Sequence, residues 1–63
     1  MNHYLITFWY KPNGKPGYMG YAPHAGPVLD FVKSTFDDTA GQYHLVSALE
    51  IDAEEYNWAQ DHL

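Results

Sequence analysis

The stretch "HYLITFWYKPNGKPGYMGYA", residues 3–22 of this 63-residue chain, holds the pattern that decides the fold. Its first part, His3 to Tyr10, is rich in β-branched and aromatic residues, which favour strands. The side chains alternate so that four apolar ones share a face, namely Tyr4, Ile6, Phe8 and Tyr10. Because that face is apolar along its whole length, we expect it to meet the core and to leave Leu5 and Trp9 on the other face.

A hairpin turn is predicted after this strand. Asn13-Gly14 is the strongest short hairpin signal, because both residues tolerate the positive φ of a type I′ turn. Pro12 and Pro16 flank the turn, and each removes a backbone donor. We therefore expect poor pairing near the turn, a tip that projects from the sheet, and a returning strand from Tyr18 to Ala22.

Two tyrosines of the returning strand, Tyr18 and Tyr21, lie three residues apart. Strict alternation puts them on opposite faces, whereas a bulge at Gly20 would turn both the same way. The sequence leaves both arrangements open.

The middle of the chain predicts one helix and one further strand. Pro27 is suited to begin a helix, where its missing N–H costs nothing, and Val28 to Phe36 carries an apolar stripe at helical spacing. Tyr43 to Ile51 then alternates as a third strand. This alternation puts Tyr43, Leu45, Ser47, Leu49 and Ile51 on one side of the strand, and His44, Val46, Ala48 and Glu50 on the other.

A short terminal helix, Ala53 to His62, is expected to complete the fold. Asp52 precedes Glu55 by three residues, which predicts a capping box at the helix start. A helix of about ten residues is marginal alone and must dock on the rest of the chain. The predicted order is ββαβα, a single α+β domain over residues 1–63 with a three-stranded antiparallel sheet.

The second face of the sheet has three open arrangements, because one helix covers only one face of three strands. In the first, the terminal helix folds over it and buries Trp9 against Tyr56 or Trp58. In the second, the face forms a homodimer, which supplies the burial that so short a chain lacks. In the third, it binds a dedicated partner.

The charge pattern favours a basic partner. Net charge is −5, divided between +2 over residues 1–27 and −7 over residues 28–63. Such a chain repels a phosphate backbone, so we expect no direct binding of nucleic acid. A basic protein surface is the expected partner of the acidic half, although a merely solvated face explains the same charges. We see no signal peptide and no apolar run that could span a membrane, and we expect a cytoplasmic protein.

No motif for catalysis or for a cofactor is found. Cysteine is absent, and the four histidines lie far apart in the sequence, so we expect no metal site. We assign the paired carboxylates Asp37-Asp38 and Glu54-Glu55 to capping and solubility. The glycines fit no phosphate-binding pattern and are explained by turns. We therefore expect a protein that is not an enzyme and has no cofactor.

Aromatic and acidic side chains remain as candidates for partner binding. Trp and Tyr carry much of the energy of protein interfaces, because they combine a large buried area with a polar tip. The candidate anchors are Trp9, Tyr18, Tyr21 and Trp58. The candidate acidic groups, which would steer the protein toward a basic patch, are Asp52, Glu54, Glu55 and Asp61.

Two segments, "YLITFWYKPNGKPGYMGY" (Tyr4–Tyr21) and "YHLVSALEIDAEEYNW" (Tyr43–Trp58), resemble the short accessory proteins of bacteriophages and prophages. The ββαβ order and the acidic, aromatic-rich composition are similar to those of the phage inhibitors of uracil-DNA glycosylase, which act as dimers and lack the terminal helix. This resemblance implies a homodimeric protein in the host cytoplasm that blocks a host enzyme, such as a nucleic-acid-processing or defence enzyme. The alternative is a dimeric binder of a nucleotide-like ligand in a ring-lined cleft, with Lys11 or Lys15 at a phosphate.

Overall fold

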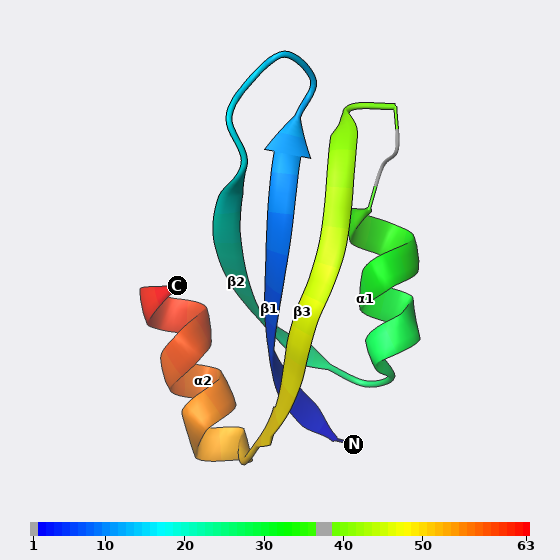
Figure 1. Ribbon diagram of the computed structural model, residues 1–63. Coiled ribbons are helices and arrows are strands. Elements are labelled where there is room, and N and C mark those ends of the chain that lie inside the picture. Colours follow the sequence, from blue (N-terminus) through cyan, green and yellow to red (C-terminus); the bar gives the residue numbers. More distant parts are fainter. Residues whose placement is uncertain (1, 37–38) are drawn as a thin grey trace.

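The computed structural model describes residues 2–36 and 39–63, and it has the predicted α+β order ββαβα (Figure 1). The elements are β1 (His3–Pro12), β2 (Tyr18–Ala25), α1 (Val28–Thr35), β3 (Gly41–Ile51) and α2 (Ala53–His62). Asp37 and Asp38, which we assigned to capping and solubility, lie outside the described residues. The terminal helix has the predicted bounds, whereas α1 begins one residue after Pro27, which is its N-cap.

The sheet has the strand order β2-β1-β3, with β1 antiparallel to both neighbours. The outer strands β2 and β3 therefore run in the same direction, and α1 is the connection between them (Figure 1). This arrangement makes β1 the strand with a neighbour on each side. Its dense run of β-branched and aromatic residues suits that central place, where side chains pack on both faces.

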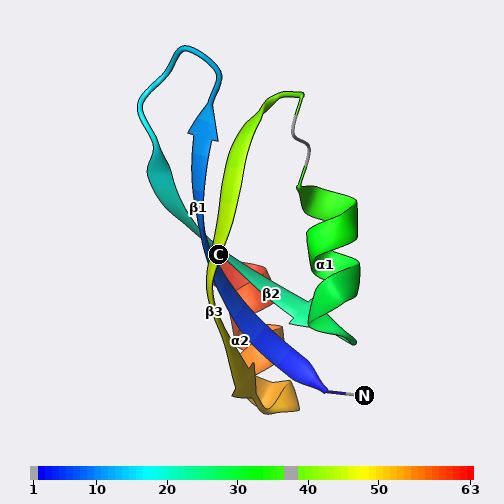
Figure 2. The ribbon, with the colours of Figure 1, turned by 45° about the vertical axis from the view of Figure 1, so that its right-hand side comes forward.

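The two helices lie on opposite faces of the sheet. Even-numbered residues of β1 face α1, since the rings of Phe8 and Phe31 lie 6.0 Å apart. Odd-numbered residues face α2, since the rings of His3 and Tyr56 lie 4.6 Å apart. Figure 2 shows α1 beside the sheet and α2 behind the lower part of the strands. Ile6, between the sheet and α1, is fully buried, so the predicted core face is confirmed.

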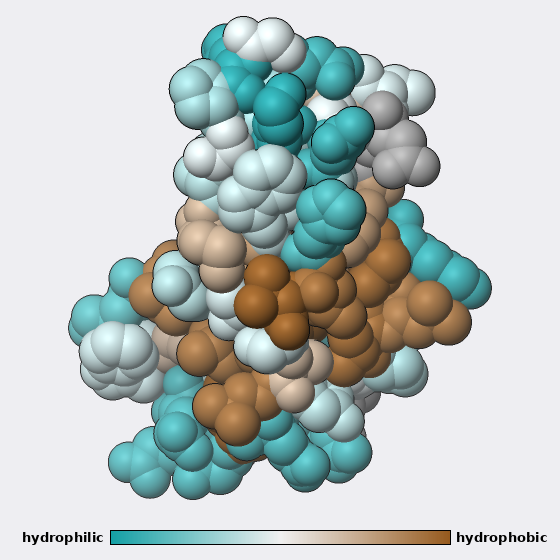
Figure 3. All heavy atoms as spheres, viewed as in Figure 1, coloured by the Kyte–Doolittle hydropathy of each residue, from teal (hydrophilic) through white to brown (hydrophobic). Residues whose placement is uncertain are grey.

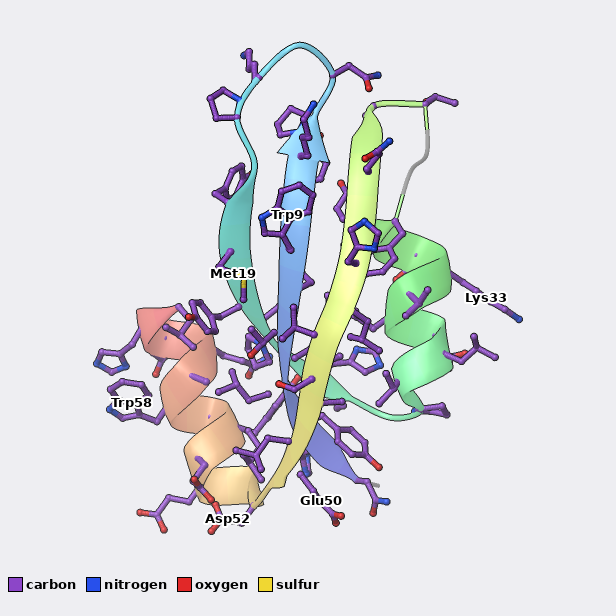
Figure 4. The ribbon with its side chains drawn as sticks, viewed as in Figure 1. Trp9, Met19, Lys33, Glu50, Asp52 and Trp58 are labelled. Atoms are coloured by element: carbon purple, nitrogen blue, oxygen red, sulfur yellow. The ribbon has the colours of Figure 1, made fainter. Side chains whose placement is uncertain are left out.

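The prediction that the terminal helix folds over the second face of the sheet and buries Trp9 is only partly correct. The terminal helix covers that face and packs against β1 and β2. Its predicted contact with Trp9 is wrong, however, because the ring neighbour of Trp9 is His44, at 5.7 Å. Tyr56 packs on His3 instead, and Trp58 stacks on His62. The helix is too short to reach the hairpin end of the sheet, where Trp9 lies (Figure 4).

A β-bulge in β3 overturns the predicted side of that strand. Thr7 lies opposite Ser47 and Phe8 lies opposite Leu45, so Val46 is an extra residue in β3. Opposite residues of an antiparallel pair share a face. Before the bulge, Tyr43 and Leu45 therefore face α1; after it, Ser47, Leu49 and Ile51 face α2. The prediction of one common side is wrong because the bulge shifts the alternation by one residue.

Strand β2 keeps strict alternation, which decides the open question about its tyrosines. Tyr18 pairs with Tyr10 and Tyr21 pairs with Thr7, so the two tyrosines lie on opposite faces. The alternative of a bulge at Gly20 is wrong. Gly20 pairs with Phe8, and a Cβ at this position would lie 2.5 Å from the Phe8 ring. The glycine is required there because the ring occupies the space of its side chain.

The hairpin turn is a type II turn and not the predicted type I′ turn. Gly14 has a φ of 74°, and no residue other than glycine has a positive φ in the described chain. The amide of Lys15 donates to the carbonyl of Pro12 at 3.2 Å, which closes the turn. Pairing with β2 ends at Tyr10 and Tyr18, as the prolines predict. The tip is nevertheless held, because the side-chain amide of Asn13 donates to the carbonyl of Thr39 at 2.9 Å.

Candidate functional site

The start of α2 is fixed by the predicted capping box. The Asp52 carboxylate accepts from the backbone N–H of Glu55 at 2.7 Å, and the Glu55 carboxylate accepts from the N–H of Asp52 at 3.4 Å. Two of the four backbone amides that lack a partner at a helix start are thereby satisfied. Glu54 and Glu55 lie in the first turn, where negative charge also opposes the positive end of the helix dipole. The helix is thus anchored directly after β3, with its acidic turn at the end of the sheet.

An apolar groove lies between α2 and the sheet. Its volume is about 450 Å³, within the range of roughly 300–1,000 Å³ that is typical of binding pockets. Its apolar lining comes from Leu5, Ile51, Ala59 and Leu63, together with Trp58 at the outer side of the helix. The remaining lining residues are acidic, namely Asp52, Glu54 and Glu55. The groove thus combines an apolar lining with negative charge from one short segment at the start of α2, Asp52 to Glu55, which forms its acidic rim.

Each wall of the groove has a separate structural origin. Ala59 is the buried contact of α2 with the sheet, and its small side chain lets the helix approach. Leu5 reaches the groove because odd residues of β1 face α2. Ile51 reaches it only because the bulge at Val46 turns the end of β3 to this face. Without the bulge, the groove would lack one of its walls.

Trp58 is the exposed aromatic of the groove. Its side chain is 59% exposed and projects from α2 away from the strands (Figure 4). The His62 ring stacks on the indole, with centroids 4.2 Å apart and planes 7° apart. Nδ1 of His62 also donates to the Trp58 carbonyl at 2.8 Å, which fixes the imidazole. The stacked pair holds the indole in place before binding, so less conformational entropy is lost when a partner packs on it.

Charge is separated along the molecule, whose longest dimension is 38 Å. Glu50 and Asp52 lie at the end where β3 passes into α2, together with the acidic first turn of the helix (Figure 4). Lys11 and Lys15 belong to the hairpin at the opposite end (Figure 1). Lys33 points away from the sheet on α1 (Figure 4). The groove therefore lies at the acidic end of the molecule.

The structure brings together half of the predicted partner-binding residues. Trp58, Asp52, Glu54 and Glu55 all line the groove. Asp61 is exposed on the same helix but is not part of the lining. Whether these residues bind a partner stays a prediction, but their common location is a finding.

The other aromatic candidates lie elsewhere. Tyr21 is exposed on the α2 face of β2, and Trp9 is half-buried on the same face near the hairpin, with its ring over Gly17. Tyr18 lies on the α1 face, where its ring meets that of Tyr10 edge-on at 5.6 Å. The predicted residues thus do not form one continuous surface.

Leu5, Ile51, Ala59 and Leu63 line the groove, but none of them was predicted to belong to a binding site. The alternation of β1 placed Leu5 on the correct face, so a signal for this residue was present. For Ile51 the sequence wrongly indicated the same side as Tyr43 and Leu45, because the bulge leaves no mark in the alternation of polar and apolar residues.

No protein family, curated protein or solved structure matches the chain. Within residues 2–36 and 39–63, no group of three or more histidine, aspartate or glutamate side chains is arranged to hold a metal ion. None of the helices in this part of the chain is long and apolar enough to cross a membrane.

Proposed function

We propose that the protein is a non-enzymatic binding protein that masks a basic surface of a larger protein. The observation that carries this proposal is the apolar groove beside α2 with carboxylates along its rim. Its partner would be a segment with an apolar side chain for the groove and lysine or arginine side chains for the rim. Trp58 would be the main anchor, since exposed, rigidly held tryptophans are typical of interface hot spots.

The charge of the site supports a protein partner of this chemistry. Asp52, Glu54 and Glu55 lie on one side of the groove and would attract a basic surface over a Debye length of about 8–10 Å. If that surface normally binds nucleic acid, the carboxylates occupy the place of phosphates and the protein acts as a competitive inhibitor. Small phage accessory proteins that block host enzymes, which the sequence resembles, act in this general way.

A nucleotide-like ligand is the competing proposal, and the groove favours it less. The lining contains carboxylates and no lysine, which is unfavourable for a phosphate. Lys11 and Lys15 lie on the hairpin, at the end of the molecule away from the acidic turn of α2. A phosphate held by these lysines would therefore not lie in the groove.

The test is affinity capture from a bacterial lysate with three forms of the tagged protein, followed by quantitative mass spectrometry. Trp58→Ala removes the anchor of the groove. Tyr18→Ala is the matched control, because Tyr18 is 56% exposed, close to the 59% of Trp58, but lies on the α1 face. We expect a partner that is lost with Trp58→Ala and kept with Tyr18→Ala. Equal retention by both variants would contradict the proposed site.

The electrostatic part of the proposal is tested on the captured partner. Glu54→Lys with Glu55→Lys reverses two rim charges, and we expect weaker affinity and a flatter dependence of affinity on salt. Asp61→Lys is the control on the same helix outside the groove. Saturable quenching of Trp9 fluorescence by nucleotides in the Trp58→Ala protein would instead support the ligand-binding alternative.

A further inference from the structure

The outer strand β3 is exposed to an unusual degree. Leu45, Val46 and Leu49 are 44%, 55% and 61% exposed, although apolar residues usually dominate the buried positions of a strand. Figure 3 shows the hydrophobic side chains that gather over β3 and continue onto α1. In the described part of the chain, β1 is the one strand that pairs with β3, so the outer edge of β3 from His44 to Ile51 is open to pairing with another strand.

The two edge strands of the sheet differ in how they are protected. Strand β2 contains Pro23, which has no N–H to donate, and α2 packs against this strand. Strand β3 contains neither proline nor lysine, the residues that most often prevent pairing at an edge, and Glu50 is its one charged residue. Of the two edges, β3 is therefore the one suited to accept another strand.

The bulge distributes the exposed leucines over both faces of the sheet. Leu45 pairs with Phe8 and faces α1, whereas Leu49 pairs with Leu5 and faces α2. A partner that packs flat on one face can cover one of the two leucines. A strand added to the edge extends the sheet and carries side chains on both faces, so it covers both.

The geometry points to a second copy of this chain as the added strand. We propose that two copies pair antiparallel through β3, around a two-fold axis near Val46, and form a continuous six-stranded sheet. Val46 is the central residue of Gly41–Ile51, so an axis between Val46 and Ser47 lets the two strands overlap along most of their length. The antiparallel arrangement also places the hairpin of each copy, with Lys11 and Lys15, beside the acidic end of the other. A parallel arrangement would place like charges together.

The change of alternation at the bulge fits this two-fold pairing. Before the bulge, odd residues of β3 face α1; after it, even residues do. Opposite residues of an antiparallel pair must share a face. In the dimer, residues before the bulge in one copy therefore lie opposite residues after the bulge in the other copy, and the two sets share a face. Leu45, for example, lies opposite Ala48 of the partner subunit. A large side chain then lies opposite a small one, which favours close packing.

This dimer adds the burial that the single chain lacks. The described chain has three buried hydrophobic residues, Ile6, Phe31 and Ala59, and a core of this size is small even for a short domain. The dimer covers β3 and leaves the groove beside α2 open, since α2 packs over β1 and β2. It does not depend on the proposed function, although Ile51 belongs both to β3 and to the groove lining and the two surfaces therefore adjoin.

The decisive experiment measures the oligomeric state of matched variants by sedimentation and light scattering. We expect the native protein to be a dimer with twice the chain mass of 7.2 kDa. Leu45→Lys should raise the dissociation constant about 100-fold or more, because each interface gains two charges in an apolar contact. Met19→Lys is the matched control, because Met19 has the same 44% exposure on the opposite edge strand. A monomeric native protein, or equal weakening by both variants, would overturn the proposal.

Two further measurements separate edge pairing from other dimers. Hydrogen exchange over residues 41–51 should slow on dimerisation, because backbone groups of the free edge become paired. The chain has no cysteine, so Val46→Cys places a single thiol close to the two-fold axis. We expect mild oxidation to cross-link this variant and not Met19→Cys. A dimer that shows neither slower exchange over residues 41–51 nor the Val46→Cys cross-link would contradict pairing through β3. Trp58→Ala should leave the oligomeric state, the exchange and the cross-link unchanged.

Discussion

The central strand β1 contributes to a filled core on one face of the sheet and to an open groove on the other. On the α1 face, β1 contributes Ile6, which is fully buried, and Phe8, which is partly buried. The Phe8 ring lies about 6 Å from those of Phe31, Phe36 and Tyr43. On the α2 face, it contributes Leu5 to a groove that stays open between the helix and the strands. The comparison teaches that a chain this short fills one face to become stable and leaves the other incomplete, which makes the second face available for binding.

The largest loss of stability is expected from a substitution on the α1 face, which is the closed face of the sheet. Ile6→Ala should lower the free energy of unfolding by about 2–5 kcal/mol, because it leaves a cavity at the most buried position of the chain. A core of this size supplies only roughly 3–5 kcal/mol, so the variant should be largely unfolded. Urea titration followed by circular dichroism measures the change.

Leu5→Ala is the matched control for Ile6→Ala, because Leu5 is the adjacent residue of β1 and lies in the open groove. We expect a clearly smaller loss than for Ile6→Ala. Equal losses for the two variants would show that both faces contribute alike to stability and would remove the contrast between them.

A smaller effect is expected at the junction between β3 and α2. Asp52→Ala removes the capping box and should cost about 1 kcal/mol, which corresponds to roughly 4–8 °C in melting temperature for a domain of this size. Asp61→Ala is the control, since it removes one carboxylate from the same helix without a role in capping. If the two variants melt at the same temperature, the cap does not hold the helix in place.

The sequence allowed most of the closed face to be predicted, and much less of the open one. The alternation of β1 correctly assigned Ile6 and Phe8 to the core, because burial on one face imposes a strict period of two. The capping box correctly set the start of α2, because its two hydrogen bonds are local in sequence. Both signals depend on residues within one element.

The groove could not be predicted in the same way, because it depends on how elements meet. The side that Ile51 faces depends on a bulge between Thr7 and Phe8 in the pairing of β1 with β3. The pattern of β3 alone is a continuous alternation, so it wrongly predicted one common side for residues that lie before and after the bulge. The turn at Asn13-Gly14 was likewise assigned the wrong type, because the loop is tied to Thr39, which is distant in sequence.

The smallest effect on stability is expected for Trp58, although its substitution should have the largest effect on binding. Trp58→Ala should change the free energy of unfolding by no more than about 0.5 kcal/mol, since the indole is mostly exposed and projects from the helix. Trp9→Ala is the control from the same face, and it should cost more, because the Trp9 ring is half-buried against Gly17 and His44. Thermal unfolding of both variants measures the difference. An exposed tryptophan that adds nothing to stability would fit the proposed role of Trp58 in binding. A stability loss for Trp58→Ala as large as that for Trp9→Ala would make Trp58 a structural residue and would remove the main anchor of the proposed groove.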